Sequence, residues 1–352
     1  MPVSSPPAPS RRPFGGGGPT LAEVGEAELL RRLTALALGA EADPRLVVAS
    51  GDDAAVWLPP AGDGIVLSQD AIVEGEDFLK SWTDPETVGR RALAVALSDL
   101  AAMGATPHLC MVTYCAPGDA PIDDLLAIQQ GLCAAAADAG CQVAGGDVSA
   151  IRGPLVIDVA VVGTVDPGRA LRRDRGRPAD ALLVTGSLGE AAAGLRLLLE
   201  GWEVAGEVGE RCLERQLEPR ARLAEGRALL ELGVECAGDL SDGLIVDLGR
   251  ITEASGCAAE IWLDSLPASP DVRALLGAAW PAAALGGGED FELVAAVAAD
   301  RLEGLLAAWP PGLQPLRVVG RLAVGSGLTL LDRRGGEPVP LPAIGSRHFR
   351  QP

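Results

Sequence analysis

The chain has 352 residues, enough for two domains, and its 48 acidic and 29 basic residues give a net charge of −19 with histidine neutral. Such a surface repels polyanions, so nucleic acids and anionic membranes are excluded as general partners. Lys80 is the only lysine and lies in no G-x-x-x-x-G-K-[ST] context, and His108 and His348 are the only histidines, so a P-loop and a His-rich metal site are excluded as well.

Residues 1–19 are rich in Pro, Ser and Gly and offer little apolar surface to bury, so the sequence predicts a disordered tail. The seven cysteines form no C-x-x-C pair, which is typical of free thiols in a reducing compartment. No run approaches the roughly 20 apolar residues that a membrane span needs. We therefore expect a cytoplasmic protein without a membrane partner.

Helices and strands alternate in the pattern of residues 20–165. The segment 83–86 is a helix start, because a capping residue precedes a proline and an acidic residue follows in the first turn, and the helix is expected to run to Gly104. The other predicted helices span 21–36 and 121–140, and the predicted strands span 53–58, 64–69, 108–115 and 154–165.

Residues 166–180 are rich in Gly, Pro and Arg without apolar periodicity, so they are the predicted junction between two domains. Further strands are predicted near 181–186, 258–263, 291–297, 316–321 and 327–331, and helices near 189–200, 220–232, 242–255 and 300–308. Several of these strands follow one another without a helix between them. We therefore expect an α/β fold with mixed, α+β-like sheets rather than a doubly wound parallel sheet.

Acidic residues gather beside Gly or Ser where predicted elements end. Taken singly, each is typical of a turn or a helix cap. They include Asp52, Asp53, Asp70, Asp99, Asp147, Asp239, Asp242, Glu289 and Asp290. If these turns converge, their carboxylates resist joint ionisation unless a counter-charge is present. The pattern therefore predicts a shared site that contains cations.

Divalent cations would remove this conflict, and oxygen ligands without Cys or His indicate Mg²⁺ or Mn²⁺. Several metal ions held by carboxylates could in turn hold the phosphates of a nucleoside triphosphate, and charge neutralisation is what phosphoryl transfer chiefly requires. An acceptor that is itself a phosphate is largely ionised at neutral pH and needs no general base. A hydroxyl acceptor would have to recruit one of the aspartates as its base.

Six ordered motifs resemble thiamine-monophosphate kinase, a family in the ATP-binding superfamily of aminoimidazole ribonucleotide synthetase, selenophosphate synthetase and HypE. They are "GDDAAVW" (51–57), "SQDAIVEGEDF" (68–78), "ALSDLAAMGATP" (96–107), "GGDVS" (145–149), "DLSDGLIVDLGRI" (239–251) and "GGGEDFEL" (286–293). The resemblance covers nearly everything from about residue 22 to the end of the sequence.

The resemblance implies an aminoimidazole ribonucleotide synthetase-like fold. Residues 20–165 would be an N-terminal domain that binds metal and ATP and dimerises through its sheet, and residues 166–352 would close over ATP and substrate. The implied reaction is the ATP-dependent phosphorylation of thiamine monophosphate to thiamine diphosphate, by direct in-line transfer assisted by several Mg²⁺ ions in a homodimer.

The resemblance also assigns roles to individual positions. The implied metal ligands are Asp53, Ser68, Gln69, Asp70, Asp99, Asp147, Asp239 and Asp242, of which Asp70 and Asp242 are also expected to serve catalysis. The implied ATP contacts are Gly146, Asp147, Arg173 and Ser241, and the implied acceptor contacts are Asp77, Glu289 and Ser346.

Three positions depart from the family pattern. Gln69 replaces a common Thr, which matters little if its backbone carbonyl is the ligand. Asp77 stands where the family typically has His, and Ser346 stands where an aromatic residue usually contacts the thiamine moiety, a contact that Phe349 or Phe291 could replace. These changes leave the ATP and metal half intact and weaken the thiamine half.

Alternative functions follow from those departures. The chain could be a related enzyme that acts on another phosphorylated metabolite, either cyclo-ligase-like or another kinase, or a catalytically silent nucleotide-binding homologue. HypE-like function would require a C-terminal cysteine, and selenophosphate synthesis would require a reactive Cys or selenocysteine and a Lys near the N-terminal glycines. The sequence has none of these at those places.

Overall fold

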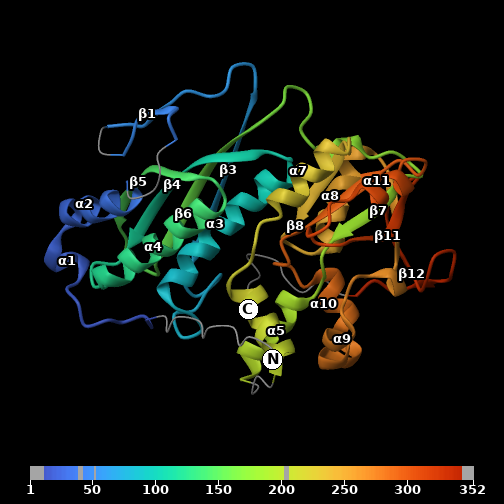
Figure 1. The fold of residues 1–352 in the computed structure, drawn as a ribbon. Coiled ribbons are helices and arrows are strands. Elements are labelled where there is room, and N and C mark those ends of the chain that lie inside the picture. The colour runs from blue at the N-terminus through green and yellow to red at the C-terminus, as the bar shows by residue number, and fades with distance from the viewer. Residues whose placement is uncertain (1–11, 39–42, 51–52, 202–205, 343–352) are drawn as a thin grey trace, which may run out of the picture.

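A computed structural model describes residues 12–38, 43–50, 53–201 and 206–342 (Figure 1). Within these ranges the chain forms a four-stranded sheet in its N-terminal half and a seven-stranded sheet in its C-terminal half. No helix in the described ranges is long and apolar enough to cross a membrane. The predicted α/β class with mixed sheets is confirmed.

The N-terminal half holds the four-stranded sheet in the order β3-β6-β4-β5, in which β4 and β5 are parallel and the other pairs antiparallel. Its strands are β3 (Gly64–Val73), β4 (Thr106–Ala116), β5 (Gln142–Ala150) and β6 (Val156–Val165), and a separate ribbon pairs β1 (Leu46–Val48) with β2 (Val56–Trp57). The helices are α1 (Leu21–Val24), α2 (Glu26–Ala37), α3 (Pro85–Ala102) and α4 (Ile122–Asp138).

Helix α3 begins where the sequence predicts. The Asp84 carboxylate accepts a hydrogen bond from the Thr87 backbone N–H at 3.0 Å, and Pro85 occupies the first turn. The helix packs closely on α4, because a Cβ at Gly89 would lie 1.9 Å from the carbonyl oxygen of Ile128. Its apolar side joins the core with the inward side chains of the four-stranded sheet. The other face of this sheet exposes Leu67 (71%), Ile65 and Met111.

The C-terminal half holds the seven-stranded sheet, whose order is β13-β12-β9-β11-β7-β10-β8 and in which only the β12–β9 pair is parallel. Its strands are β7 (Ala181–Thr185), β8 (Cys236–Leu240), β9 (Ala258–Trp262), β10 (Glu292–Val297), β11 (Leu316–Ala323), β12 (Gly327–Leu331) and β13 (Pro338–Val339). The helices are α5 (Glu190–Glu200), α6 (Gly206–Leu217), α7 (Leu223–Glu231), α8 (Leu244–Ser255), α9 (Pro270–Leu276), α10 (Trp280–Gly286) and α11 (Leu302–Ala308). Short 3₁₀ turns are η1 (Arg173–Arg175), η2 (Leu263–Ser265) and η3 (Gly277–Ala279).

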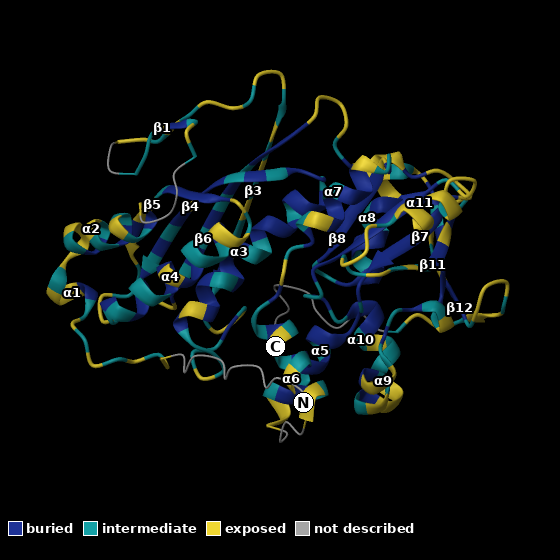
Figure 2. Ribbon diagram, in the orientation of Figure 1, coloured by how far each residue is buried: buried dark blue, intermediate teal, exposed yellow. Residues whose placement is uncertain are grey.

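The two halves meet along α3, which crosses the middle of the molecule (Figure 1). A Cβ at Gly226 of α7 would lie 2.0 Å from the carbonyl oxygen of Ala101, so these two helices touch through their backbones. Ala101 and Ala102 belong to a core cluster that includes Leu229 and Leu230 of α7. Figure 2 shows buried residues running from the four-stranded sheet through α3 and α7 to β8. The end of α3 is thus fixed between both sheets.

Several predicted elements differ from the observed ones. The helix expected over 21–36 is interrupted at Gly25, whose φ of 82° ends α1, and the strand expected over 53–58 contains only Val56–Trp57 in regular pairing. Strands β1, β5, β8 and β13 and helices α6, α9 and α10 lie outside the predicted ranges. Strand β5 was missed because Gly and Asp are rare in strands, but Gly146 is required there, since its Cβ would lie 1.9 Å from the Val112 carbonyl oxygen.

Candidate active site

Strand β3 and helix α3 bring the first predicted site residues together. Ser68 and Asp70 occupy alternate positions of β3 and therefore share one face of the sheet, the face that α3 covers. Ser68 Oγ donates a hydrogen bond to Asp99 Oδ2 on α3 at 2.5 Å. The Asp99 carboxylate is therefore held against β3, on the same side of the sheet as Asp70.

Asp239 joins this group from the other half of the chain. It lies in β8, is only 3% exposed, and accepts a hydrogen bond from Ser98 Oγ at 3.0 Å. Arg173 Nη2 in η1 lies 3.6 Å from the other carboxylate oxygen of Asp239. The neighbouring residues Ser98 and Asp99 thus link the C-terminal sheet to β3.

The electrostatics of the group agree with this convergence. The pKa of Asp70 is raised to about 6, chiefly by burial and then by the charges of Asp99, Asp239 and Asp158. Burial and then the charge of Asp99 raise the pKa of Asp239. Burial also raises the pKa of Asp247, on α8, to about 7, with a contribution from Asp239. Negative charge is therefore in excess between the two sheets, where a cation would be stabilised.

This donor set fits Mg²⁺ when phosphate oxygens complete the coordination. Carboxylate and hydroxyl oxygens are the ligands that Mg²⁺ prefers, and it commonly uses one or two carboxylates with substrate phosphates and water. Within the described ranges, no three acidic, His or Cys side chains are grouped closely enough to hold a metal ion alone. The residues are thus suited to a metal shared with a phosphorylated ligand rather than to a closed protein cage.

A cleft of about 440 Å³ opens beside this group. Ser68 and Asp99 line one side, and Arg173 and Gly238 line the other. The Arg173 guanidinium is partly exposed and is the kind of bidentate donor that binds phosphate oxygens. We call this the Arg173 cleft.

A second cleft, of about 190 Å³, lies at the other end of α3 and is called the Glu289 cleft. It brings together four predicted site residues, Asp77, Ser241, Asp242 and Glu289. The remaining lining combines apolar and aromatic side chains with a few polar groups: Glu76, Phe78, Trp82, Thr83, Val88, Arg91, Leu195, Gln216, Leu217, Gly287 and Gly288. Such a lining suits a small organic ligand that carries positive charge.

Two glycine turns join the "DLSDGL" and "GGGED" motifs in this cleft. Gly243 has a φ of 102°, and a Cβ there would lie 2.9 Å from Gly286 Cα, so the turns pack backbone to backbone. The Glu289 N–H donates to the Ser241 carbonyl oxygen at 2.7 Å. The close packing of the turns therefore explains why the two motifs contribute to one cleft.

Asp242 lies on the wall of the Glu289 cleft, and Arg250 of α8 offsets its charge. Arg250 Nη2 donates to Asp242 Oδ2, and Arg250 Nη1 donates to Asp247 Oδ1 at 2.5 Å. Asp247 Oδ2 in turn accepts from the Asp242 backbone N–H at 2.9 Å. Asp247 and Arg250 were not among the predicted site residues, although both lie in the quoted motif at helical spacing.

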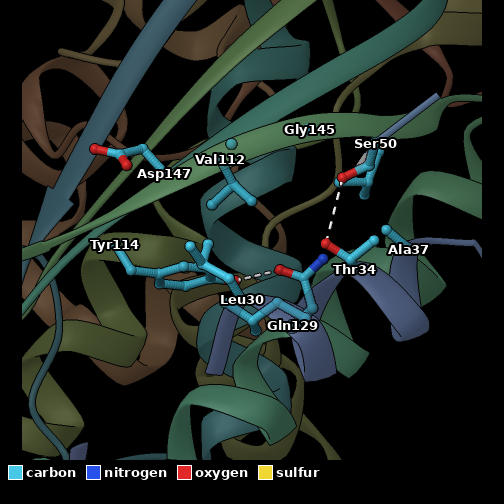
Figure 3. Close-up of a pocket in the computed structure, with 12 residues that line it drawn as sticks. Leu30, Thr34, Ala37, Ser50, Val112, Tyr114, Gln129, Gly145 and Asp147 are labelled. Carbon is cyan, nitrogen blue, oxygen red and sulfur yellow. Dashed lines mark hydrogen bonds between the residues drawn. The ribbon is translucent and has the colours of Figure 1, made fainter. Parts of the chain in front are cut away.

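Other predicted residues lie away from the Asp70 group. Asp147 of β5 pairs with Thr113 of β4, and Thr113 pairs with Asp158 of β6. Because paired residues of neighbouring strands point to the same face, Asp147 lies on the open face of the sheet, opposite Asp70. Its carboxylate points away from the small pocket, of about 40 Å³, that Tyr114, Gln129 and Gly146 help to line (Figure 3). The side chain of Gln69 also faces the open side and donates to Asp158 Oδ2 at 2.6 Å.

Asp53 is exposed in the bend before β2, and the charges that raise the pKa of Asp70 include neither Asp53 nor Asp147. Ser346 and Phe349 lie outside the described residues, and Phe291 is buried at 4% exposure. The expectation that the acidic residues occupy turns is wrong for Asp70, Asp99 and Asp147, which lie within β3, α3 and β5. Whether these side chains meet is decided by the face of the strand or helix on which each one lies, and not by its distance from the end of that element.

Family models match most of the chain. The AIR synthase related protein N-terminal domain matches residues 51–165, and the corresponding C-terminal domain matches residues 177–332. The thiamine-monophosphate kinase of Salmonella typhimurium is 37% identical over 313 residues, which cover 86% of this chain and 92% of that protein. The chain belongs to the thiamine-monophosphate kinase family. The member from Mycobacterium tuberculosis is 32% identical over 320 residues, covering 89% of this chain and 90% of its own.

Solved structures of the family agree with the fold. The thiamine-monophosphate kinase from Stenotrophomonas maltophilia superposes with a TM-score of 0.76 at 37% identity, covering 86% of this chain and 95% of its own. AaThiL, complexed with AMPPCP and TMP, superposes with a TM-score of 0.71 at 28% identity, covering 92% and 97%. Escherichia coli HypE, at 22% identity and a TM-score of 0.72, covers 90% and 98% and shares the fold.

Proposed function

We propose that this chain transfers the γ-phosphoryl group of ATP to thiamine monophosphate and releases ADP and thiamine diphosphate. An oxygen of the acceptor phosphate forms the new bond to the γ-phosphorus, and the bond from that phosphorus to the β,γ-bridging oxygen breaks. The observation that carries the proposal is the pair of clefts joined by residues 239–242 and by α3, one beside clustered carboxylates with Arg173 and the other beside Glu289.

The Arg173 cleft is the proposed nucleotide side. Mg²⁺ ions bound by Asp70, Asp99 and Asp239 would neutralise the triphosphate and the charge that develops during in-line transfer. Ser68 and Ser98 hold two of these carboxylates through the hydrogen bonds described above. Arg173 is positioned to close over the polyphosphate. Gly146, Asp147, Gln69 and Asp53 stay predicted nucleotide or metal contacts.

The Glu289 cleft is the proposed acceptor side. Its apolar and aromatic walls, which include Trp82, Val88 and Leu217, suit the rings of thiamine, and its carboxylates suit the thiazolium charge. Among the described residues that line the two clefts there is no histidine, and His108 lies between Arg45 and Thr164. Transfer needs no general base, since the acceptor phosphate is largely ionised at neutral pH. Asp242 lines this cleft and stays a predicted metal ligand, and Asp77 and Ser346 stay predicted acceptor contacts.

We further propose that residues 20–165 and 166–352 act as two domains and that two copies pair through the open face of the four-stranded sheet. Exposed Ile65, Leu67 and Met111 supply apolar surface for that contact. Sedimentation of the wild type and of Leu67→Glu tests this, because a dimer should dissociate in the variant. A wild-type monomer would contradict the proposal.

The cytoplasm is the proposed compartment. All seven cysteines are free thiols in the structure, and five of them are buried. Free buried thiols are stable in a reducing environment.

Turnover assays test the function. The protein is incubated with Mg·ATP and, separately, thiamine monophosphate, thiamine and other phosphorylated metabolites, while ADP and the new diphosphate are measured. We expect turnover with thiamine monophosphate and none with thiamine, which offers only a hydroxyl. Turnover with a different phosphorylated acceptor alone would redirect the assignment within the superfamily. ATP binding without turnover on any acceptor would contradict it.

A further inference from the structure

We propose that Arg91 is a positioning residue that holds Glu289 in place on the wall of the acceptor cleft. The inference rests on the proposed function, because it takes Glu289 to be the carboxylate that faces the acceptor. Arg91 lies on α3 in the N-terminal half, whereas Glu289 lies in the turn before β10 in the C-terminal half. The contact therefore joins the two halves at the cleft itself.

Both carboxylate oxygens of Glu289 are held. Arg91 Nη2 donates to Glu289 Oε1, and Gln216 Nε2, from α6, donates to Glu289 Oε2 at 2.5 Å. Arg91 Nη1 also donates to the Gln216 backbone carbonyl oxygen at 2.5 Å, so Arg91 fixes its neighbour in the same clamp. Glu289 can keep one orientation only while these donors are present.

The backbone at Glu289 adopts an uncommon conformation. Its φ of 58° lies in the left-handed region, which residues with a Cβ seldom adopt and which persists where the surroundings hold it. The side chain of Glu289 is 32% exposed, whereas that of Arg91 is 4% exposed. Arg91 therefore lies behind Glu289, and the accessible part of the carboxylate faces the cleft.

Charge in the cleft leads to the same assignment. Among the described residues that line it, Arg91 is the one cationic side chain, whereas four lining residues are acidic: Glu76, Asp77, Asp242 and Glu289. Within the described residues the buried Nε of Arg91 has no acceptor, so the guanidinium is held through Nη1 and Nη2, which donate to Gln216 and Glu289.

Helix α3 carries this clamp and the metal-side contact together. Arg91 and Ser98 are seven residues apart, so they share a face of the helix about 10 Å apart along its axis. Ser98 holds Asp239 beside the Arg173 cleft, and Arg91 holds Glu289 beside the acceptor cleft. One rigid helix thus sets the distance between the nucleotide-side and acceptor-side carboxylates.

Steady-state kinetics of Arg91→Met, Arg91→Lys and Gln216→Met test the clamp. For Arg91→Met we expect the KM for thiamine monophosphate to rise about 10- to 100-fold, with the KM for ATP within about twofold of the wild type. Arg91→Lys should recover part of the loss. If Arg91→Met does not fold, Gln216→Met takes its place in the test, and it should raise the acceptor KM by about three- to tenfold. Arg90→Met is the matched control, because Arg90 pairs with Asp138 and Glu218 outside the cleft.

A merely structural role for Arg91 would lower stability without separating the two KM values. The clamp is therefore wrong if folded Arg91→Met keeps the acceptor KM of the wild type or raises both KM values equally. A double-mutant cycle of Arg91→Met and Glu289→Gln, measured by denaturant unfolding of the four proteins, gives the coupling free energy between the two side chains without any need for turnover. A coupling free energy of zero overturns the clamp. If the coupling is present but the wild type is inactive on thiamine monophosphate, only the proposed function is overturned.

Discussion

Replacing Asp70 with Asn should stabilise the metal-free protein while abolishing its activity. The folded-state pKa of Asp70, about 6, exceeds its ordinary value of 3.8, so the folded protein binds this proton more tightly than the unfolded chain. Stability is therefore lost as pH rises through the window from about 4 to about 6, and the loss is complete at neutral pH. Asn carries no charge and is free of this loss.

The magnitude follows from the same values. The difference between 3.8 and about 6 corresponds to about 3 kcal/mol as an upper bound. Because Asp70 is only partly buried, solvent screening lowers the expected gain to about 1–2 kcal/mol, or a rise in Tm of about 1–3 °C for a chain of this size. Activity should fall at least about 100-fold, because a ligand that acts on the transferred charge is lost.

Thermal unfolding in EDTA at about pH 8 and about pH 4.5, together with turnover in Mg·ATP, measures both effects. The stabilisation should be full at the higher pH and roughly a third as large at the lower one, which lies near the start of the window. Asp166→Asn is a matched control, since it removes one charge from an exposed side chain that pairs with Arg169. A variant less stable than the wild type at the higher pH, or one with near-normal turnover, would refute the reasoning.

Three further changes separate the parts of the site. Ser98→Ala removes the hydrogen bond to Asp239 and should lower kcat about tenfold, with the acceptor KM little changed, in steady-state assays; an unchanged kcat would argue against a role for that contact. Trp82→Ala removes an aromatic wall of the Glu289 cleft and should raise the acceptor KM about tenfold but not the KM for ATP; equal effects on both would contradict the cleft assignment. Asp290 is partly buried, and desolvation raises its pKa to about 7, so the wild type should lose stability as pH rises from about 4 to 7. Denaturant unfolding should show a flatter pH dependence in Asp290→Asn, and identical profiles would refute that assignment.

The sequence predicted the elements whose local signals agree with their packing. Helix α3 begins at its Asp84 cap and proline, and the turns at Ser241 and Gly288 meet because only glycine fits their close approach. The like-charge argument predicted that all the acidic motifs would meet around shared cations. The structure brings Asp70, Asp99 and Asp239 together, whereas Asp53 and Asp147 lie apart from them. The pKa values of Asp70 and Asp239 are raised because both carboxylates are buried and lie near other acidic side chains.

Other features depend on contacts that no local pattern contains. Strand β5 contains Gly145 and Gly146, which pair with β4, so its composition hides it, and the face on which Asp147 lies depends on that pairing. Arg91 and Glu289 are 198 residues apart and meet only because α3 packs against the C-terminal half. The seven-residue spacing predicts that Arg91 and Ser98 lie on the same face of α3, but only the fold shows that Glu289 is the partner of Arg91.

Mn²⁺ located by anomalous diffraction, in crystals grown with a non-hydrolysable ATP analogue, tests the central claim most directly. The account predicts Mn²⁺ bound between the triphosphate and the carboxylates of Asp70, Asp99 and Asp239, beside Arg173. Nucleotide bound elsewhere, or Mn²⁺ that contacts none of these three carboxylates, would contradict it.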